Sequence, residues 1–205
     1  RICKQYGVFV ASDEIHCDFA FAEHPHHVFL GACPELADQA LVCTAPSKTF
    51  NLAGLVGSYS IIYNSWLRDR CSKEGSLSHY NAMNVMSMHA LLGAYKPEGC
   101  EWVEELRQVI TGNVDFACDY IAQHFNGVEV SRPQGTYMLF LDCEKWLTAH
   151  GKTMDELLAA GWDVGVVWQD GRAFHGQTHI RMNLALPLSR VQEAFRRLDT
   201  YVFNA

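Results

Sequence analysis

Two short apolar runs, each followed by a charged residue either at once or a few positions later, constrain the fold of this chain more than any other feature. Residues 8–12 (VFVAS) and 40–44 (ALVCT) are continuous rather than alternating, and they are rich in β-branched and aromatic side chains. Such a run is typical of a strand buried on both faces, as in a parallel sheet. Residues 57–63 supply a third candidate strand. The sequence therefore predicts an α/β fold that contains the end of a mostly parallel sheet with helices.

The rest of the chain mixes helices and strands. Apolar residues recur at helical spacing from Trp102 to Phe125 and predict one long amphipathic helix. Shorter helices are expected at residues 65–72, 78–95, 153–160 and 189–201, and strands at 128–130, 136–142, 164–168 and 179–186. We therefore expect part of a large domain at residues 1–95, a connecting helix at 96–125 and a smaller α+β domain at 126–205.

Composition excludes several classes of function. With 23 acidic and 16 basic residues the formal net charge is −7, and a nucleic-acid-binding surface is normally basic, so nucleic acid is an unexpected partner. No apolar run approaches the roughly 20 residues of a membrane span. The eight cysteines form no CxxC pair, and we interpret them as reduced thiols in a cytoplasmic protein. His24, His26 and His27 lack further residues at ligand spacing, so we interpret them as surface-loop residues and expect no metal site.

Three polar residues stand out by their places relative to the predicted strands. Two of them follow the end of a strand, and the third lies within a strand. Asp13 follows the first apolar run and Lys48 follows the second by a few residues. Because open α/β sheets bind ligands beyond the carboxyl ends of their strands, both side chains are expected at such a crevice. Arg181 belongs to a strand in which it shares a face with Asn183. Taken singly, these residues would be a turn or cap carboxylate, a solvated loop lysine and a structural ion-pair arginine.

Three sequence blocks together carry a resemblance. They are SDEIHCD at residues 12–18, APSKTFNLAGL at 45–55 and IRMN at 180–183, and they occur in this order. The chain resembles the fold-type I pyridoxal-phosphate enzymes of the class I/II aminotransferase superfamily, and within it the cystathionine β-lyase or cysteine-S-conjugate β-lyase branch. The resemblance covers essentially the whole chain. Residues 1–7 read as the last turns of a helix closed by a glycine, so we expect a carboxyl-terminal part of a longer protein.

The resemblance implies a role for each candidate site residue. Lys48 would form the Schiff base with the aldehyde of pyridoxal 5'-phosphate and later remove the substrate Cα proton. Asp13 would keep the pyridine nitrogen protonated, and His16 would either donate to the ring hydroxyl oxygen or support Asp13. Ser47 would donate to the cofactor phosphate. Arg181 would bind the α-carboxylate of an amino-acid substrate through two parallel hydrogen bonds.

The chain departs from the family pattern near Lys48. Many aminotransferases carry a basic phosphate ligand eight positions after the lysine, where this chain has Val56, and often a serine three positions before it, where this chain has Ala45. The phosphate ligands are therefore expected to come in part from elsewhere.

Three functions remain open on the sequence. The preferred one is a β-lyase that cleaves cystathionine or another cysteine S-conjugate to a thiol, pyruvate and ammonia. An aminotransferase would use the same groups, and a non-catalytic regulatory relative would not use them. The resemblance also implies a homodimer, in which relatives place cofactor sites at the subunit boundary.

Overall fold

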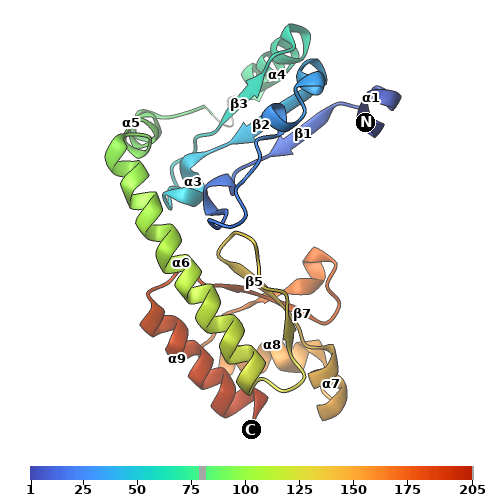
Figure 1. The fold of residues 1–205 in the computed structure, drawn as a ribbon, viewed down its shortest axis with the longest axis vertical. Coiled ribbons are helices and arrows are strands. Elements are labelled where there is room, and N and C mark those ends of the chain that lie inside the picture. Colours follow the sequence, from blue (N-terminus) through green and yellow to red (C-terminus); the bar gives the residue numbers. More distant parts are fainter. Residues whose placement is uncertain (79–81, 205) are drawn as a thin grey trace. The chain divides into compact units, whose positions relative to one another are not determined.

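In a computed structural model that describes residues 1–78 and 82–204, the polypeptide divides into two units. The first comprises residues 1–105 and the second begins at residue 106 (Figure 1). Each unit has its own sheet. The division falls within a long helix, α6 (Pro97–His124).

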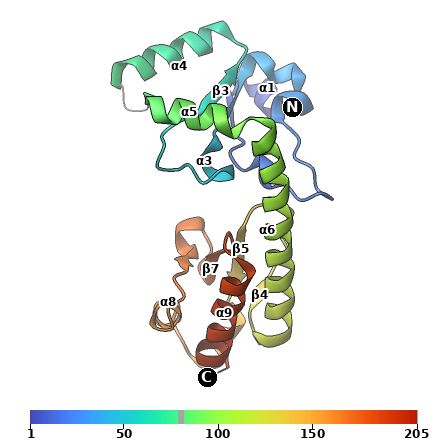
Figure 2. The ribbon, with the colours of Figure 1, turned by 90° about the vertical axis from the view of Figure 1, so that its left-hand side faces the viewer.

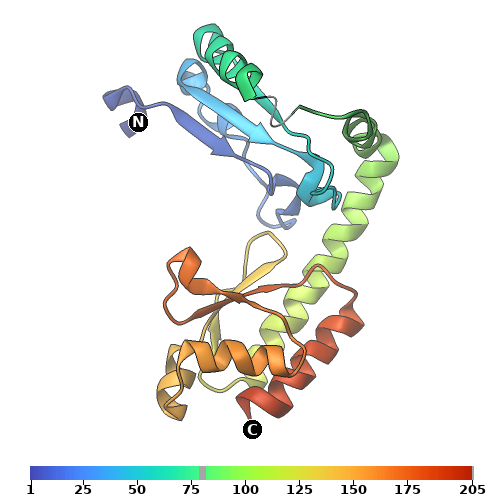
Figure 3. The same ribbon diagram turned by 180° about the vertical axis from the view of Figure 1, so that it is seen from behind.

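The sheet of the first unit has three strands. β1 (Val10–Asp13) runs parallel to β2 (Ala40–Thr44), and β3 (Tyr59–Ile62) pairs antiparallel with the other edge of β2. Ala40 and Val42 are buried, whereas Ala11 and Asp13 are exposed. The prediction of burial on both faces is therefore wrong for β1, because the described residues cover only one of its faces. Figure 3 shows β1 and β2 side by side.

Short helices surround this sheet. They are α1 (Ile2–Tyr6), α2 (Phe29–Ala32), α3 (Pro46–Thr49), α4 (Ser65–Ser78) and α5 (Val85–Ala94), with two 3-10 helices, η1 (Cys17–Phe19) and η2 (Pro34–Gln39). Gly7 closes α1 in the left-handed region at φ 62°, as expected for a glycine cap.

One helix expected in this unit is shorter than predicted. The predicted helix at residues 78–95 crosses residues 79–81, which lie outside the described part of the chain. α5 begins only after Asn84, whose side chain accepts a hydrogen bond from the backbone N–H of Ser87 at 2.9 Å. This cap sets the start of α5, since an Asn at this position satisfies an N–H that the helix leaves unpaired.

α6 begins within one residue of the start predicted for the connecting helix, although its apolar periodicity begins only at Trp102. Pro97 occupies its start, where a missing backbone N–H costs nothing. Gly99 is required in the first turn, because a Cβ there would lie 1.9 Å from the carbonyl oxygen of Ala94. The Pro-Glu-Gly sequence that resembles a break is therefore part of the helix.

The sheet of the second unit is antiparallel. Its strands are β4 (Glu129–Val130), β5 (Met138–Asp142), β6 (Gln169–Asp170) and β7 (His179–Asn183), in the order β4-β5-β7-β6. Leu139, Leu141 and Ile180 on one face are at most 1% exposed and form part of the core. This antiparallel sheet with helices is the predicted α+β arrangement.

Two helices pack side by side in the second unit. α6 and α9 (Leu188–Leu198) are adjacent in Figure 2, and the ring of Phe195 lies 5.7 Å from that of Phe116 and 5.6 Å from that of Tyr120. The remaining helices are α7 (Glu144–His150), α8 (Met154–Asp163), the 3-10 helix η3 (Gly171–Phe174) and a terminal π-helical turn, η4 (Asp199–Phe203).

The strand predicted at residues 164–168 is wrong. Gly165 has φ 78° and belongs to the turn that ends α8, and β6 starts only at Gln169. The apolar run is explained by Trp168, which is 2% exposed and donates from its indole N–H to the carbonyl oxygen of Leu158 at 3.2 Å. A Cβ at Gly161 would lie 2.2 Å from the Trp168 ring, so the glycine makes room for it. In the described ranges, no helix is both long and apolar enough to cross a membrane.

Candidate active site on the first sheet, and an arginine face on the second

Asp13 is the last residue of β1 and lies beside the end of β2. In the parallel register it is opposite Cys43, and the N–H of Glu14 donates to the carbonyl oxygen of Cys43 at 2.9 Å. The Asp13 side chain is exposed, and its Oδ1 accepts from the N–H of Ile15 at 3.1 Å. One carboxylate oxygen therefore shapes the turn, while Oδ2 has no hydrogen bond to any residue that the structure describes.

Lys48 lies on α3, the single helical turn that follows β2 (Figure 1). Ala45 and Pro46 at the start of this turn are buried, whereas Lys48 is exposed. Within residues 1–78 and 82–204, the Lys48 ammonium makes no hydrogen bond or ion pair. Ser47 precedes it and is half-buried. The turn ends at Asn51, which has φ 53°, a left-handed conformation that Asn tolerates better than most residues.

His16 is positioned by the segment that follows β1. It lies just before η1, is half-buried, and its ring centroid is 5.7 Å from that of Phe19. The structure therefore places Asp13 at the carboxyl end of β1, His16 on the connection that follows it, and Ser47 and Lys48 on the connection that follows the neighbouring parallel strand β2. For Asp13 and Lys48 this is where the strand pattern of the sequence predicts them.

A buried carboxylate supports the turn after Asp13. Glu14 is only 6% exposed and accepts hydrogen bonds from the hydroxyl of Ser12 at 3.1 Å, the N–H of Phe29 at 2.8 Å and Nε2 of His26 at 2.9 Å. Burial alone would raise the pKa of Glu14, but these hydrogen bonds, led by the one from His26, outweigh it and hold the pKa below its ordinary value. Glu14 thereby fastens the following loop to the strand end.

The Glu14–His26 contact could not be predicted from the sequence pattern. All three histidines of this loop are exposed, as expected for surface-loop residues, yet His26 also binds a buried group twelve positions earlier. The one available signal is the position of Glu14 directly after a predicted strand. A carboxylate that becomes buried there needs a hydrogen-bond donor as its partner. In the part of the chain that the structure describes, no cluster of three or more His, Cys, Asp or Glu residues could hold a metal ion.

Arg181 lies at the centre of β7, in the second unit. Ile180, Met182 and Leu184 are buried on one face of the strand, and Arg181 and Asn183 lie on the other, which confirms the predicted division. The side chain is half-buried. No carboxylate of the described residues lies within ion-pair distance of it, so the structural ion-pair alternative finds no support there.

Two neighbours orient the Arg181 guanidinium. Its central carbon lies 4.6 Å from the centroid of the Phe174 ring, which is the geometry of a cation–π contact. One terminal nitrogen donates to Oε1 of Gln169 at 3.3 Å, and Phe140 is opposite Arg181 in the register of β5 and β7. Most of the guanidinium N–H groups therefore remain available for a planar anion such as a carboxylate.

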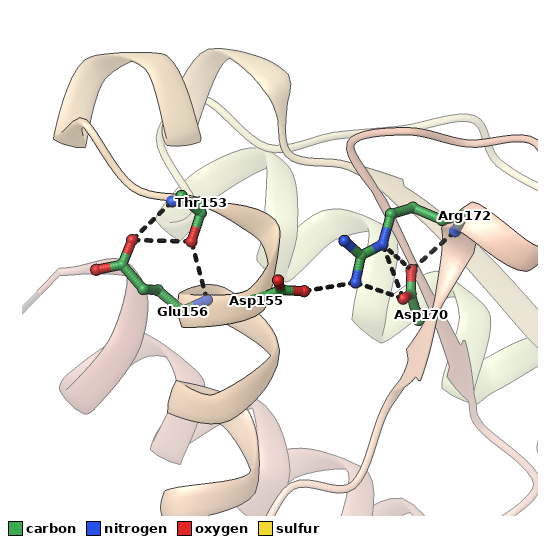
Figure 4. A network of polar contacts seen from close by, with 5 residues as sticks. All are labelled: Thr153, Asp155, Glu156, Asp170 and Arg172. Carbon is green, nitrogen blue, oxygen red and sulfur yellow. Dashed lines mark hydrogen bonds and ion pairs between the residues drawn. The ribbon is translucent and has the colours of Figure 1, made fainter.

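The turn that carries Phe174 is anchored by a polar network (Figure 4). Arg172 donates from Nε to both oxygens of Asp170, at 3.0 and 2.8 Å, and from a terminal nitrogen to Asp155 at 2.5 Å. Asp155 stands in the first turn of α8, whose start is set by a reciprocal capping box between Thr153 and Glu156. Because these residues are largely exposed, the network orients the turn that carries Phe174 but adds little to the free energy of folding.

A pocket of about 830 Å³ borders this face at Phe140 and His179. Its wall includes Arg132, which forms ion pairs with Asp115 and with Asp119. Because these carboxylates already neutralise Arg132, the pocket is a weaker candidate for binding an anion than the face of β7 that carries Arg181.

Comparison with known proteins gives a family and a fold. Residues 1–198 match the model of the family described as aminotransferase class I and II. The chain is 29% identical over 200 residues to cystathionine β-lyase PatB of Bacillus subtilis, covering 97% of this chain and 51% of that protein. It is 25% identical over 207 residues to an aspartate aminotransferase of Geobacillus stearothermophilus, covering 98% of this chain and 51% of the relative.

A solved structure supports the same relationship. Cystalysin of Treponema denticola, whose crystal structure contains pyridoxal 5'-phosphate, superposes with a TM-score of 0.88 at 29% identity, covering 98% of this chain and 50% of that one. The chain thus spans about half the length of the curated relatives it matches.

Proposed function

Because this chain belongs to the class I and II aminotransferase family and has the fold of the fold-type I pyridoxal-phosphate enzymes, we propose that it forms part of a carbon–sulfur β-lyase. The substrate class would be cystathionine or other cysteine S-conjugates, and the products a thiol, pyruvate and ammonia. The similarity to the cystathionine β-lyase of Bacillus subtilis supports this choice of substrate.

The donor set on the first sheet fits pyridoxal 5'-phosphate. This cofactor needs a primary amine to hold its aldehyde and a carboxylate to keep its ring nitrogen protonated. Among the residues that the structure describes, the exposed amine of Lys48 has no partner, and the exposed carboxylate of Asp13 keeps one oxygen, Oδ2, without a hydrogen bond. Asp13 ends β1, and Lys48 follows the adjacent parallel strand β2. The occurrence of these two available groups at neighbouring strand ends is the observation that carries the proposal.

The cofactor, when bound, supplies a protonated ring that accepts the electron pair left on the substrate Cα. Lys48 would hold the aldehyde through its Nζ and, with its amine free, would accept the substrate Cα proton. Asp13 would accept a hydrogen bond from the ring nitrogen and keep the proton there. Ser47 would donate to the phosphate, and His16 would donate to the ring oxygen or support Asp13.

Arg181 would bind the substrate α-carboxylate. Its planar guanidinium can place two parallel N–H groups on a carboxylate, and the contact with Phe174 limits its rotation. We further propose that the full-length protein is a cytoplasmic homodimer.

An aminotransferase is the second candidate, favoured by the similarity to the aspartate aminotransferase. It would use the same residues, with the proton taken by Lys48 returned to the cofactor instead of a β-substituent being expelled. Incubation of the full-length protein with cystathionine and pyridoxal 5'-phosphate separates the two. Thiol and pyruvate released without a keto-acid acceptor support the lyase. Turnover only when a keto acid is added supports the aminotransferase.

A further inference from the structure

A partly buried hydrogen bond joins the two segments that carry the candidate cofactor residues. The hydroxyl of Thr49 donates to Oδ2 of Asp18 at 2.7 Å. Thr49 is 1% exposed and follows Lys48 directly, while Asp18 belongs to η1 and lies five residues after Asp13. The bond therefore spans from the lysine turn to the carboxylate segment.

The chemistry of this contact is directional. A hydroxyl that donates to a carboxylate makes a short, charge-assisted bond, and 2.7 Å lies in that range. A valine at the position of Thr49 would have nearly the same volume but no hydroxyl. Its apolar contacts are not directional, so they would not fix the position of α3 relative to η1. The hydrogen bond from buried Thr49 to half-buried Asp18 instead fixes one distance between the two segments.

Among the described residues, few other contacts fix the position of α3 relative to neighbouring segments. It is a single turn, closed by backbone bonds from Phe50 to Pro46 at 2.9 Å and from Leu52 to Ser47 at 2.9 Å. On the side of Phe50, the turn is packed against aromatic rings, with centroid distances of 5.8 Å to Tyr95 and 5.6 Å to Trp102. These contacts hold the end of the turn, and the Thr49 hydroxyl ties it to η1.

We propose that Thr49 is a positioning residue, which acts through Asp18 to hold the Lys48 amine at the spacing from Asp13 that one cofactor ring requires. The inference rests on the proposed function, since it assumes that Lys48 and Asp13 contact the same ring. It adds a residue pair whose role is to set the geometry of the amine, without contact to the substrate.

The test uses the full-length protein loaded with pyridoxal 5'-phosphate. Thr49→Val removes the hydroxyl at nearly constant volume, and Thr49→Ser keeps it. Thr111→Val is the matched control, because the hydroxyl of Thr111 also donates one bond, at 2.8 Å to a backbone carbonyl, but lies on α6 in the second unit. Four quantities are measured: the pH midpoint of the cofactor absorption band, the cofactor dissociation constant, and kcat and KM for the amino-acid substrate.

If Thr49→Val misplaces the Lys48 amine, we expect a shifted pH midpoint of the cofactor absorption band. We also expect kcat to fall about tenfold, with KM much less affected. Thr49→Ser should restore both, and Thr111→Val should leave both unchanged. Asp18→Ala should reproduce the shift, and the double variant should be no worse than either single one, because the two residues act through one bond.

Other results would overturn the inference. A Thr49→Val protein that loses thermal stability but keeps the wild-type pH midpoint and kcat would reduce the bond to a structural contact. Independent, additive effects of Thr49→Val and Asp18→Ala would do the same. Failure of the proposed function is visible separately, because then the wild-type protein itself would lack a cofactor band that Lys48→Ala removes.

Discussion

Asn113 offers the most direct test of how the strand that carries Arg181 is held in place. It lies on α6, is 1% exposed, and its side-chain Nδ2 donates to the carbonyl oxygens of Leu184 at 2.9 Å and Leu186 at 2.8 Å. These two carbonyls come just after β7. Asn113→Leu removes both bonds while nearly preserving the side-chain volume.

The expected change in the free energy of unfolding follows from the hydrogen bonds that each carbonyl oxygen loses. The Leu184 oxygen still accepts from the N–H of Leu186 at 2.8 Å, so it loses only one of two bonds. The Leu186 oxygen loses the only donor that it has among the described residues. The change also removes Oδ1 of Asn113, a buried atom without a partner in the described part of the chain, and this offsets part of the cost. We expect a loss of about 2 kcal/mol in the free energy of unfolding.

The assay is urea and thermal unfolding of the purified protein, followed by tryptophan fluorescence. A loss of this size predicts a fall in Tm of roughly 4–8 °C for a chain of this length. Asn204→Leu is the control, because its Nδ2 also donates to a carbonyl, that of His124 at 3.0 Å, but the side chain is exposed. The control should change stability by less than about 0.5 kcal/mol. Equal losses in the two variants, or none in Asn113→Leu, would refute the reasoning.

Three further predictions concern charge and exposure. Arg181→Lys should raise KM for the amino-acid substrate by about ten- to a hundredfold, since lysine cannot make the two-point contact, and a matching loss of cofactor affinity in a cofactor titration would contradict this. The lowered pKa of Glu14 stabilises the fold above the ordinary carboxyl value of 4.5, and this contribution is lost as pH falls through the lowered pKa. Urea midpoints from about pH 7 to pH 3 should therefore decline less steeply in Glu14→Gln, which weakens the contact with His26, and an unchanged slope would argue against it. Burial raises the pKa of Cys143 to about 12, so iodoacetamide and mass spectrometry should find Cys143 unlabelled and exposed Cys71 labelled, whereas equal labelling would speak against a buried thiol.

The ends of the first two strands could be predicted from the sequence. β2 occupies the predicted residues, and β1 ends within one residue of the prediction, at Asp13. The reason is local, because a continuous apolar run that is followed by acidic residues, as at Asp13, or by a proline, as at Pro46, indicates both a strand and its end. The placement of Asp13 and Lys48 beyond neighbouring strand ends follows from this, while their roles stay predictions.

Contacts between distant parts of the chain could not be predicted. Glu14 and His26 are separated by a loop without apolar periodicity, and Thr49 meets Asp18 across 31 positions. Neither pair has a sequence signature, since each forms only after the strands have been brought together. The failed strand at residues 164–168 has a related cause, because burial of Trp168 against α8 produces the same apolar pattern as a strand does.

The measurement that tests the central claim most directly is identification of the lysine that holds the cofactor. The full-length protein is loaded with pyridoxal 5'-phosphate, reduced with borohydride, digested and mapped by mass spectrometry. The account predicts the cofactor mass on the peptide that contains Lys48, and its loss in Lys48→Ala but not in Lys73→Ala. A cofactor attached to another lysine, or an equal yield from Lys48→Ala, would contradict it.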